Sequence, residues 1–397
     1  RQRAEAFRTA FAGWSISYAG KAFLCGGMAR WAEQEGLGLD VCSGHELAVA
    51  LAAGFPAERI TFHGNNKSTD DLRAAVEAGA RWIVVDSDCE IARLEALGQE
   101  LGRPIPVLVR VTTGIDAHTD ERIATALWDQ KFGFSTLGGP ECPAAKALKR
   151  CHESPVIDLA GVHSHVGSQI FDTPALLMAG RRLLGLLDRF HQETGAQPRE
   201  LNLGGGFGIA YTVQDHPGDL ETVAQAFRTL LDEAAGRGLT ELHGSIEPGR
   251  SLIGPAGTAL YTVGTVKPVD TGGGRIRWYV AVDGGMSDNI RPALYGADYT
   301  AVVANRVSGA APVLARVVGR HCESGDILVR DVYLPGDIAP GDLIAMPGCG
   351  AYSRAMASNY NLFARPPVIA LGSEGETVMV RRERWEDIVA LDPVISG

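Results

Sequence analysis

The fold is decided first by the stretch SISYAGKAF at residues 15–23. Its first part, SISYA, is a β-favouring run, which is typical of a short strand. Lys21 follows between the small residues Gly20 and Ala22, so we expect the strand to end there. Similar short runs recur through the first 250 residues, each followed by a longer helical stretch. This alternation predicts repeated βα units around a parallel sheet.

Eight such runs can be counted, with ends placed to within about two to four residues. They lie at residues 16–19, 39–42, 60–62, 82–86, 107–111, 159–163, 200–203 and 242–246. Eight βα units indicate a closed (β/α)8 barrel of the TIM type, in which functional side chains gather at the C-terminal ends of the strands. The notable polar residues of this part fall at those ends: Lys21, Asp40, His63, His165, Gly204, Gly205, Gly206 and Glu247.

The pattern changes beyond Pro255 to closely spaced β-like runs separated by Gly, Pro and Asp turns. These runs lie at residues 260–266, 277–282, 313–318, 343–346 and 378–382. We therefore expect an α/β barrel domain over residues 1–253, followed by an all-β, antiparallel barrel-like or sandwich-like domain over residues 254–397. The polar, interrupted segment 114–136 is a candidate lid.

Composition argues against two classes of partner. A formal net charge of -10 disfavours nucleic acid, which needs clustered Lys and Arg. No apolar run approaches the roughly 20 residues of a membrane span, so no membrane partner is expected.

Seven cysteines without a Cys-x-x-Cys pair, and no signal peptide, indicate reduced thiols, no zinc site and a cytoplasmic location. The chain begins inside a predicted helix without a methionine, so we expect a natural N-terminal segment to be missing.

Lys21 is the first candidate for chemistry. A partly desolvated amine at a strand's C-terminal end, flanked by small residues, can hold a Schiff base with an aldehyde such as pyridoxal phosphate. Taken alone, Lys21 fits a surface lysine better, because most lysines stay in water. The other motifs reverse that preference.

A glycine run after the seventh predicted strand is a candidate phosphate site. Gly204, Gly205 and Gly206 would let backbone amides approach an anion closely. The run is not a Rossmann fingerprint, because Ile209 stands where the last glycine should be. A plain tight turn fits it about as well.

The motif VHSHVGSQ at residues 162–169 places two histidines on the same side of a strand. No third ligand has suitable spacing for a metal site. A histidine that stacks on a flat ring, with Ser168 serving a phosphate, is the better functional interpretation. Either His163 or His165 could instead be a core histidine.

The motif EPGR at residues 247–250 closes the eighth predicted strand. The Glu247 carboxylate could pair with a protonated pyridine nitrogen, which strengthens such a ring as an electron sink. Arg250 could meet a phosphate or a carboxylate. An ordinary surface ion pair is the alternative.

The β domain has polar motifs of its own: RPALY at residues 291–295, HCESGD at 321–326 and GAY at 350–352. Arg291 and Tyr295 offer a cation and a phenol, and Cys322 stands beside the acid Glu323. Either motif could be a mere turn. Cys322 could also be a buried, inert cysteine, since a reactive thiol needs an environment that sequence does not display.

Together these motifs resemble those of the diaminopimelate decarboxylases, pyridoxal-phosphate enzymes of fold type III that share a barrel with alanine racemase and eukaryotic ornithine decarboxylases. The resemblance covers nearly the whole chain: YAGKA at 18–22, HGNNK at 63–67, HSHVGSQ at 163–169, GGG at 204–206, EPGR at 247–250, CESGD at 322–326 and MASNYN at 356–361. Each motif is weak alone, but their shared order is hard to obtain otherwise. Gly20 departs from the pattern, since relatives often carry a larger residue there, and an upstream strand of the β domain is missing.

The resemblance implies a role for each matching residue. Lys21 would carry pyridoxal 5'-phosphate, His165 would stack on its ring, and Glu247 would face its pyridine nitrogen. Further cofactor ligands would be Ser168, Gly204, Gly205, Gly206, Gly249, Arg250 and Tyr352. Substrate ligands would be Arg250, Arg291, Tyr295, Glu323 and Tyr352. Cys322 is the candidate proton donor, and Lys21 remains the alternative.

The implied reaction is decarboxylation of meso-2,6-diaminopimelate to L-lysine and CO2, the last step of lysine biosynthesis. Arg291, Tyr295 and Glu323 would suit a substrate with an amino-carboxylate at each end. The resemblance also implies a homodimer with shared active sites, in which Cys322 and Glu323 enter the site of the other subunit. The alternatives are a decarboxylase of ornithine, arginine or a carrier-bound amino acid, an amino-acid racemase, and a non-catalytic pyridoxal-phosphate-binding protein, which the additional β domain disfavours.

Overall fold

The computed structural model describes residues 1–115, 128–373 and 375–396, so residues 116–127 of the candidate lid lie outside this description. The chain divides into two compact units. The first unit consists of Arg1–Gly208 and His216–Leu252, and the second of Ile209–Asp215 and Ile253–Gly397. The sequence pattern contains no sign of the excursion at Ile209–Asp215, of which Ile209 and Tyr211 pack in the core of the second unit.

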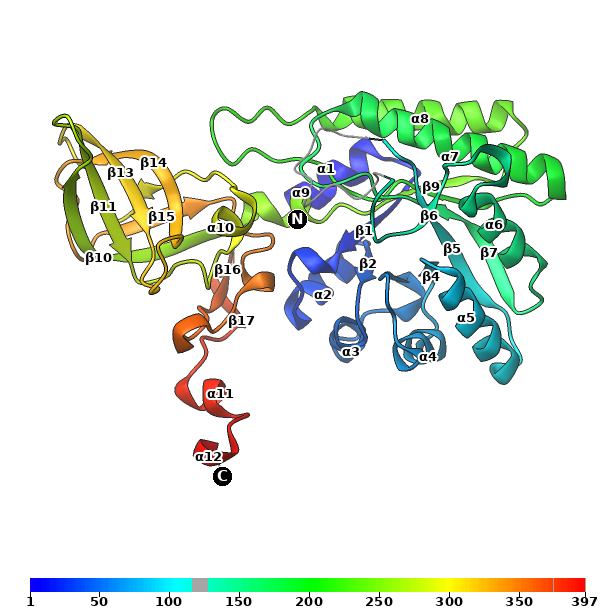
Figure 1. Cartoon of the computed structure of the whole chain (residues 1–397), viewed down its shortest axis with the longest axis horizontal. Helices are drawn as coiled ribbons and strands as arrows, with labels where there is room; N and C mark the ends of the chain where they lie inside the picture. The colour runs from blue at the N-terminus through cyan, green and yellow to red at the C-terminus, as the bar shows by residue number, and fades with distance from the viewer. Residues whose placement is uncertain (116–127, 374, 397) are drawn as a thin grey trace. The chain divides into compact units, whose positions relative to one another are not determined.

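The first unit is a closed parallel β-barrel, as the sequence predicted (Figure 1). Its strands are β1 Ser15–Ala19, β2 Gly38–Val41, β3 Ile60–Phe62, β4 Trp82–Val85, β5 Ile105–Thr112, β7 Ile157–His163, β8 Glu200–Asn202 and β9 His243–Ile246. Neighbours pair in parallel in the order β4-β3-β2-β1-β9-β8-β7-β5, and pairing of β4 with β5 closes the ring. A two-residue strand, β6 (Phe134–Ser135), adds to the end of β5.

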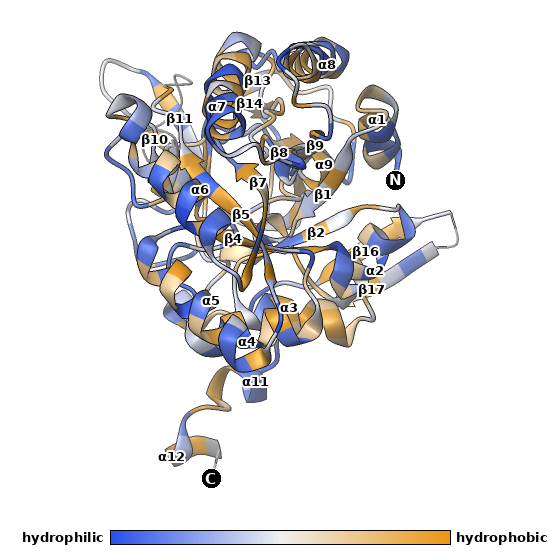
Figure 2. Cartoon of the chain, turned by 90° about the vertical axis from the view of Figure 1, so that its right-hand side faces the viewer, coloured by the Kyte–Doolittle hydropathy of each residue, from blue (hydrophilic) through white to orange (hydrophobic). Residues whose placement is uncertain are grey.

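Helices surround this barrel and cover its strands (Figure 1). They are α1 Gln2–Ala10, α2 Gly26–Gln34, α3 Gly44–Ala52, α4 Thr69–Ala78, α5 Asp88–Leu101, α6 Pro143–Glu153, α7 Thr173–Thr194, α8 Leu220–Gly236 and the short α9 Arg250–Ile253. Hydrophobic and hydrophilic residues alternate around helices such as α4 and α5, as amphipathic packing requires (Figure 2). The strands are almost wholly buried, so the barrel interior is the core of this unit.

Local sequence signals explain where these helices begin and end. In α4, the Ser68 hydroxyl accepts the backbone N–H of Asp71 and the Asp71 carboxylate accepts the N–H of Ser68, both at 3.0 Å. This reciprocal capping box satisfies two donors that the first helical turn leaves unpaired. Gly79 ends the helix with φ +82°, a left-handed conformation that glycine adopts without steric cost.

The second unit is built on a mixed six-stranded sheet in the order β12-β15-β10-β11-β13-β14. Its strands are β10 Thr258–Asp270, β11 Ile276–Val282, β12 Val302–Val303, β13 Pro312–Val318, β14 Ile327–Pro335 and β15 Leu343–Pro347. The predicted all-β domain is confirmed, but β11 and β13 pair in parallel rather than antiparallel. The long connection between them contains helix α10 (Arg291–Tyr295), and a connection of that length allows a parallel crossover.

The rest of the second unit is a two-stranded hairpin of β16 (Val368–Gly372) and β17 (Gly375–Val380), followed by α11 (Trp385–Val389) and α12 (Pro393–Ser396). In the described part of the chain, no helix combines the length and apolar character needed to cross a membrane.

Candidate active site

The polar residues singled out from the sequence lie at one end of the barrel, where the parallel strands finish. Lys21 follows β1 by two residues, Asp40 is the second-last residue of β2, and His63 directly follows β3. His163 ends β7 and Glu247 directly follows β9. The C-terminal rim therefore collects side chains that are up to 226 positions apart in the sequence, from Lys21 to Glu247.

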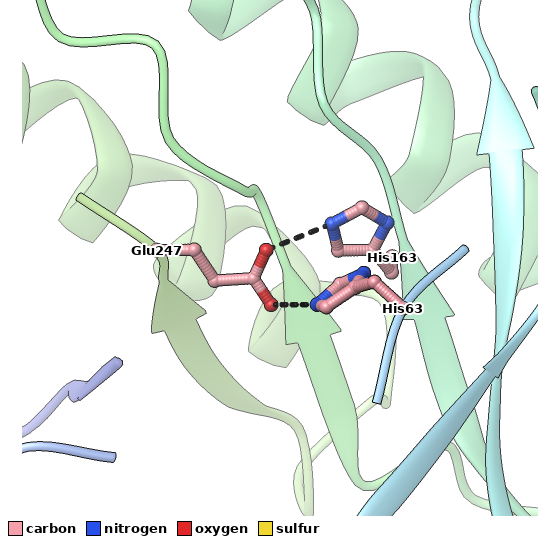
Figure 3. Close-up of side chains that lie close together, drawn as sticks. All are labelled: His63, His163 and Glu247. Carbon is pink, nitrogen blue, oxygen red and sulfur yellow. Dashed lines mark hydrogen bonds and ion pairs between the residues drawn. The ribbon is translucent and has the colours of Figure 1, made fainter. Parts of the chain in front are cut away.

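Glu247 is the centre of a buried hydrogen-bond network (Figure 3). Its Oε2 accepts Nε2–H of His163 at 3.0 Å, and its Oε1 accepts Nε2–H of His63 at 3.1 Å. Oε1 also accepts Nδ2–H of Asn202 at 2.6 Å. Only 7% of Glu247 is exposed, which rules out an ordinary surface ion pair. A carboxylate only accepts hydrogen bonds, so these three N–H donors converge on it.

This network fixes the charge of Glu247. Burial acts to raise its pKa, but the interactions with His63 and His163 outweigh burial and hold the pKa well below its usual range. Burial lowers the pKa of His163 to about 4, so at neutral pH this ring is a neutral N–H donor. Glu247 is therefore a carboxylate at neutral pH.

Asp40 lies beside Glu247 and behaves in the opposite way. Its carboxyl is almost fully buried, and burial followed by the negative charge of Glu247 raises its pKa well above the usual value. Two neighbouring carboxyl groups in a low-dielectric site cannot both ionise easily, so Asp40 holds a proton while Glu247 does not. Asp40 received no role from sequence, although its place at a strand end was a signal.

His165 is held in one orientation by the glycine loop. The backbone N–H of Gly205 donates to Nδ1 of His165 at 3.2 Å, so this nitrogen carries no proton and Nε2 carries it in the neutral ring. Burial, followed by the positive charge of Lys21, lowers the pKa of His165 well below its usual value. The ring is therefore a neutral, flat surface at the rim.

The loop after β8 needs glycines because the backbone of neighbouring segments lies too close for a side chain. A Cβ on Gly205 would lie 2.2 Å from the carbonyl oxygen of Glu247, and a Cβ on Gly206 would lie 2.4 Å from that of Gly167. Real Cβ atoms do not come so near, so any side chain here would push the loop away from the rim. The three glycines thus form a cradle of backbone groups.

Two predicted phosphate ligands contact each other. Nη2 of Arg250, at the start of α9, donates to Oγ of Ser168 at 2.9 Å. Arg250 is 7% exposed, so it is a buried cation beside a hydroxyl. Gly249 precedes it, and a Cβ there would lie 2.9 Å from that of Ala19. This group suits an anion such as a phosphate.

Lys21 differs from the expectation in one respect. It lies in the short 3-10 turn Gly20–Ala22, where both neighbours are buried but Lys21 itself is exposed. Lys21 is therefore more exposed than the partly desolvated amine that the sequence suggested, and its role as the cofactor anchor stays a prediction. Its charge still acts on Asp40 and His165.

Lys67 of the HGNNK motif has a supporting position. Its buried Nζ forms an ion pair with Glu90 at 2.6 Å and donates to the carbonyl oxygens of Gly64 at 2.6 Å and Val84 at 2.8 Å. These contacts tie the loop after His63 to β4. From the sequence, Lys67 was recognised only as part of the HGNNK motif, and its supporting position was not predicted.

In the second unit, Arg291 begins α10 and is buried at 5% exposure. Its Nη1 donates to the hydroxyl of Tyr299, and its guanidinium lies 4.7 Å from the ring centre of Tyr211. Its Nε has no hydrogen-bond partner among the described residues, so this cation retains a donor. Tyr295, at the end of α10, is partly exposed.

Cys322 and Glu323 occupy an exposed loop between β13 and β14. The exposure of Cys322 removes its interpretation as a buried, inert thiol. Asp326 holds the loop, because its carboxylate accepts N–H of Met286 at 2.6 Å, and both N–H and Nδ1–H of His321 at 2.9 Å each.

Tyr352 also lies in the second unit, and its backbone has φ +62°. A bulky residue in this left-handed region stores strain, which is common at functional sites.

The cluster of His63, His163 and Glu247 also brings three potential metal ligands within 4.8 Å of one another. A metal on Nε2 of His163 would force that ring's proton onto Nδ1, which is buried and has no partner among the described residues. Metal-bound histidines normally donate that proton to an acceptor. The cluster is better explained as a carboxylate with its donors, and the expected absence of a metal stays a prediction.

The rim fits pyridoxal phosphate. It offers an amine at Lys21, a flat neutral ring at His165, and a carboxylate at Glu247 that buried donors hold in place. The glycine loop leaves room for close approach to its backbone, and the buried pair of Arg250 and Ser168 offers N–H and O–H donors to a phosphate. These groups match the aldehyde, ring, ring nitrogen and phosphate of this cofactor.

Known proteins with similar sequences and structures point the same way. A family model described as the pyridoxal binding domain of pyridoxal-dependent decarboxylases matches residues 1–254. Diaminopimelate decarboxylase of Mycobacterium tuberculosis is 49% identical over 397 residues, covering 99% of this chain and 88% of that protein. The Bacillus subtilis enzyme of the same name is 47% identical, covering 99% and 89%. The crystal structure of diaminopimelate decarboxylase from Helicobacter pylori complexed with L-lysine has a TM-score of 0.89 and 30% identity, covering 98% of this chain and 93% of that one.

The chain therefore belongs to the pyridoxal-dependent decarboxylases and, within them, to the diaminopimelate decarboxylase family. The expected fold class, the carboxy-lyase class and the pyridoxal-phosphate cofactor are confirmed by this membership. The roles of individual residues stay predictions.

Proposed function

We propose that this protein decarboxylates meso-2,6-diaminopimelate to L-lysine and CO2 as the last step of lysine biosynthesis. The observation that carries the proposal is the rim of the barrel, where a buried carboxylate and a strand-end lysine stand beside an anion cradle. Relatives that share 47–49% of the sequence along nearly the whole chain are named for this reaction.

The rim residues divide the cofactor between them. Bound pyridoxal phosphate supplies an aldehyde that bonds an amine and a ring that accepts the electron pair left when CO2 departs. In this proposal Lys21 provides the amine that holds the cofactor, and His165 covers one face of its ring. Glu247 accepts a hydrogen bond from the ring nitrogen. Ser168, Gly204, Gly205 and Gly206 would hold the phosphate, and further cofactor ligands would be Gly249, Arg250 and Tyr352.

The residues of the second unit would recognise the substrate. A substrate with an amino-carboxylate at each end needs cations for its carboxylate and an anion for its distal ammonium. Arg250, Arg291 and Tyr295 would receive carboxylate and Glu323 the distal ammonium. Tyr352 would also touch the substrate. Ornithine or lysine as substrate would leave a buried arginine without its anion, which costs affinity.

The exposed loop of Cys322 suggests how the active site is completed. Cys322 would return a proton to the substrate carbon after CO2 leaves, with Lys21 as the alternative donor. Because Cys322 and Glu323 are exposed on one chain, we propose that they serve the site of a second copy in a homodimer. A monomer would then be inactive. We also propose that the enzyme works in the cytoplasm.

The test is to incubate the purified full chain, loaded with pyridoxal phosphate, with meso-diaminopimelate and to measure L-lysine and CO2. We expect equal amounts of both, and none from a Lys21→Ala variant. Release of CO2 from ornithine, arginine or another amino acid, but not from meso-diaminopimelate, would overturn the proposed substrate.

A further inference from the structure

The donors that surround Glu247 come from the ends of three different strands. His63 follows β3, His163 ends β7 and Asn202 ends β8, while Glu247 itself follows β9. Each donor is at least 91% buried, since none exceeds 9% exposure of its side chain or residue. Three buried donors converging on one carboxylate restrict both its position and its protonation.

The direction of the Asn202 donor is fixed by a second bond. Oδ1 of Asn202 accepts N–H of Gly204 at 2.8 Å, and its Nδ2–H donates to Glu247 at 2.6 Å. A flipped amide would point its NH2 group at the Gly204 N–H and its oxygen at the carboxylate, so both contacts would become repulsive. Asn202 therefore links the glycine cradle to Glu247.

The histidine tautomers are fixed in the same way. An ionised Glu247 only accepts, so both rings must carry their proton on Nε2. The two rings also pack edge to face, with centres 4.8 Å apart, so neither can rotate without displacing the other. The loop after His63 is in turn held by the contacts of Lys67 with the carbonyl oxygens of Gly64 and Val84.

We propose that His63 and His163, with Asn202, are positioning residues that keep the negative charge on Glu247 and orient its carboxylate towards the ring nitrogen of the cofactor. A proton shared between that nitrogen and Glu247 then stays on the nitrogen, because the carboxylate is already stabilised by three other donors. Asp40 faces the same carboxylate as a neutral acid, and Arg110 adds a buried positive charge nearby. The proposal rests on the part of the proposed function that places the cofactor at Glu247.

Removing one of these donors should make Glu247 more basic. Without His163 the carboxylate is a stronger base, so the shared proton moves from the ring nitrogen towards Glu247. A ring without its proton is a weaker electron sink. We expect kcat to fall roughly tenfold to a hundredfold, the equivalent of one charge-assisted hydrogen bond, with a smaller change in KM.

The direct readout is the 15N chemical shift of pyridoxal phosphate labelled at the ring nitrogen and bound to the full chain. In the unmodified protein we expect the shift of a protonated pyridine. In His163→Phe, and in His63→Phe, we expect a displacement towards the neutral pyridine value. His163→Gln, which retains an N–H donor, should restore part of the protonated signal.

The matched control is His191→Phe. His191 also makes one hydrogen bond through its ring, from Nδ1 to the carbonyl oxygen of Ala196, but on helix α7 rather than at the rim. It should leave the shift unchanged. A protonated signal in both phenylalanine variants would overturn the proposal. Should His163→Phe not fold, His63→Phe decides the question alone.

This measurement needs the bound cofactor but no substrate. A failure of the proposed substrate would therefore leave the 15N result intact, and a negative 15N result would leave decarboxylation of meso-diaminopimelate untouched. A bound cofactor whose shift responds to none of the rim variants, Glu247→Gln included, would instead contradict the placement of its ring nitrogen at Glu247.

Discussion

Two carboxylates, one in each unit, are held by three N–H donors, but they are assembled in different ways. Glu247 receives its donors from residues 63, 163 and 202, far apart in the sequence and joined only when the barrel closes. Asp326 receives two of its donors from His321, five residues away in the same loop, and the third from Met286. The first network depends on the whole barrel, whereas the second mostly stabilises one turn.

The two networks also present different groups. The three donors around Glu247 fix a carboxylate that itself does chemistry in the proposed function. Asp326 is buried, and a Cβ on Gly319 would lie only 2.1 Å from its Oδ2. The loop that Asp326 stabilises carries the exposed residues Cys322 and Glu323. Changing Glu247 should therefore affect catalysis more than folding, and changing Asp326 should affect the loop before anything else.

The largest effect is expected for Glu247→Gln. An uncharged amide cannot stabilise a protonated ring nitrogen, so kcat should fall by roughly a hundredfold to a thousandfold, as for other preorganised electrostatic groups. The steady-state rate of L-lysine formation is the measurement. Glu200→Gln is the control. Glu200 is also a buried acid, but it is the first residue of β8 and so lies at the end of the barrel opposite to the C-terminal rim. An equal loss of kcat in both variants would contradict a special role for Glu247.

Asp326→Asn comes next. The amide keeps one acceptor oxygen but places its NH2 group against the N–H donor of Met286 or against those of His321, which should lower the free energy of unfolding of the second unit by about 2 kcal/mol. The thiol of Cys322 should also react faster with a thiol reagent, because its loop is less ordered. Asp331→Asn, in an exposed ion pair with Arg277, is the control. Unchanged stability together with an unchanged thiol rate would argue against this role of Asp326.

The network around Glu247 should also make the stability of the protein depend on pH. Burial lowers the pKa of His163 to about 4 in the folded state, below its value of about 6.5 in an unfolded chain. The unfolded chain therefore binds a proton first as the pH falls, and this group's contribution to stability is lost between pH 6.5 and 4. The loss has a slope of up to about 1.4 kcal/mol per pH unit. Urea unfolding of His163→Gln should show a correspondingly flatter pH profile, and an unchanged profile would be the contrary result.

The smallest effect is expected outside both networks. Arg73 and Glu100 form a bidentate ion pair on exposed helices α4 and α5. Water and salt screen such a pair, so Arg73→Ala should leave the unfolding midpoint and kcat unchanged within error. A clear loss in either measurement would show that surface charges matter here as much as the buried networks.

The comparison also explains what the sequence could predict. Each barrel strand was predicted, because the period of apolar residues is a local signal. Strand β14 was missed, since Arg330 and Asp331 interrupt its apolar pattern, and the parallel pairing of β11 with β13 depends on a long crossover rather than on either strand.

For the candidate site, the sequence indicated which residues stand at strand ends but not what they contact. His63 and Asn202 received no role, because their partner Glu247 is reached only through the closed barrel. The exposure of Lys21 was also not predicted, since it depends on how the chain turns after β1. The carboxyl ends of the strands were predictable, whereas the bonds between them required the structure.

The most direct test of the account is to load the full chain with pyridoxal phosphate, reduce it with borohydride, and locate the modified lysine by peptide mass spectrometry. We expect the label on Lys21, the exposed lysine at the rim. Lys67 is the informative comparison, because it also follows a barrel strand but is buried in an ion pair with Glu90. A label on Lys67 or on another lysine, or no label at all, would contradict the rim as the cofactor site.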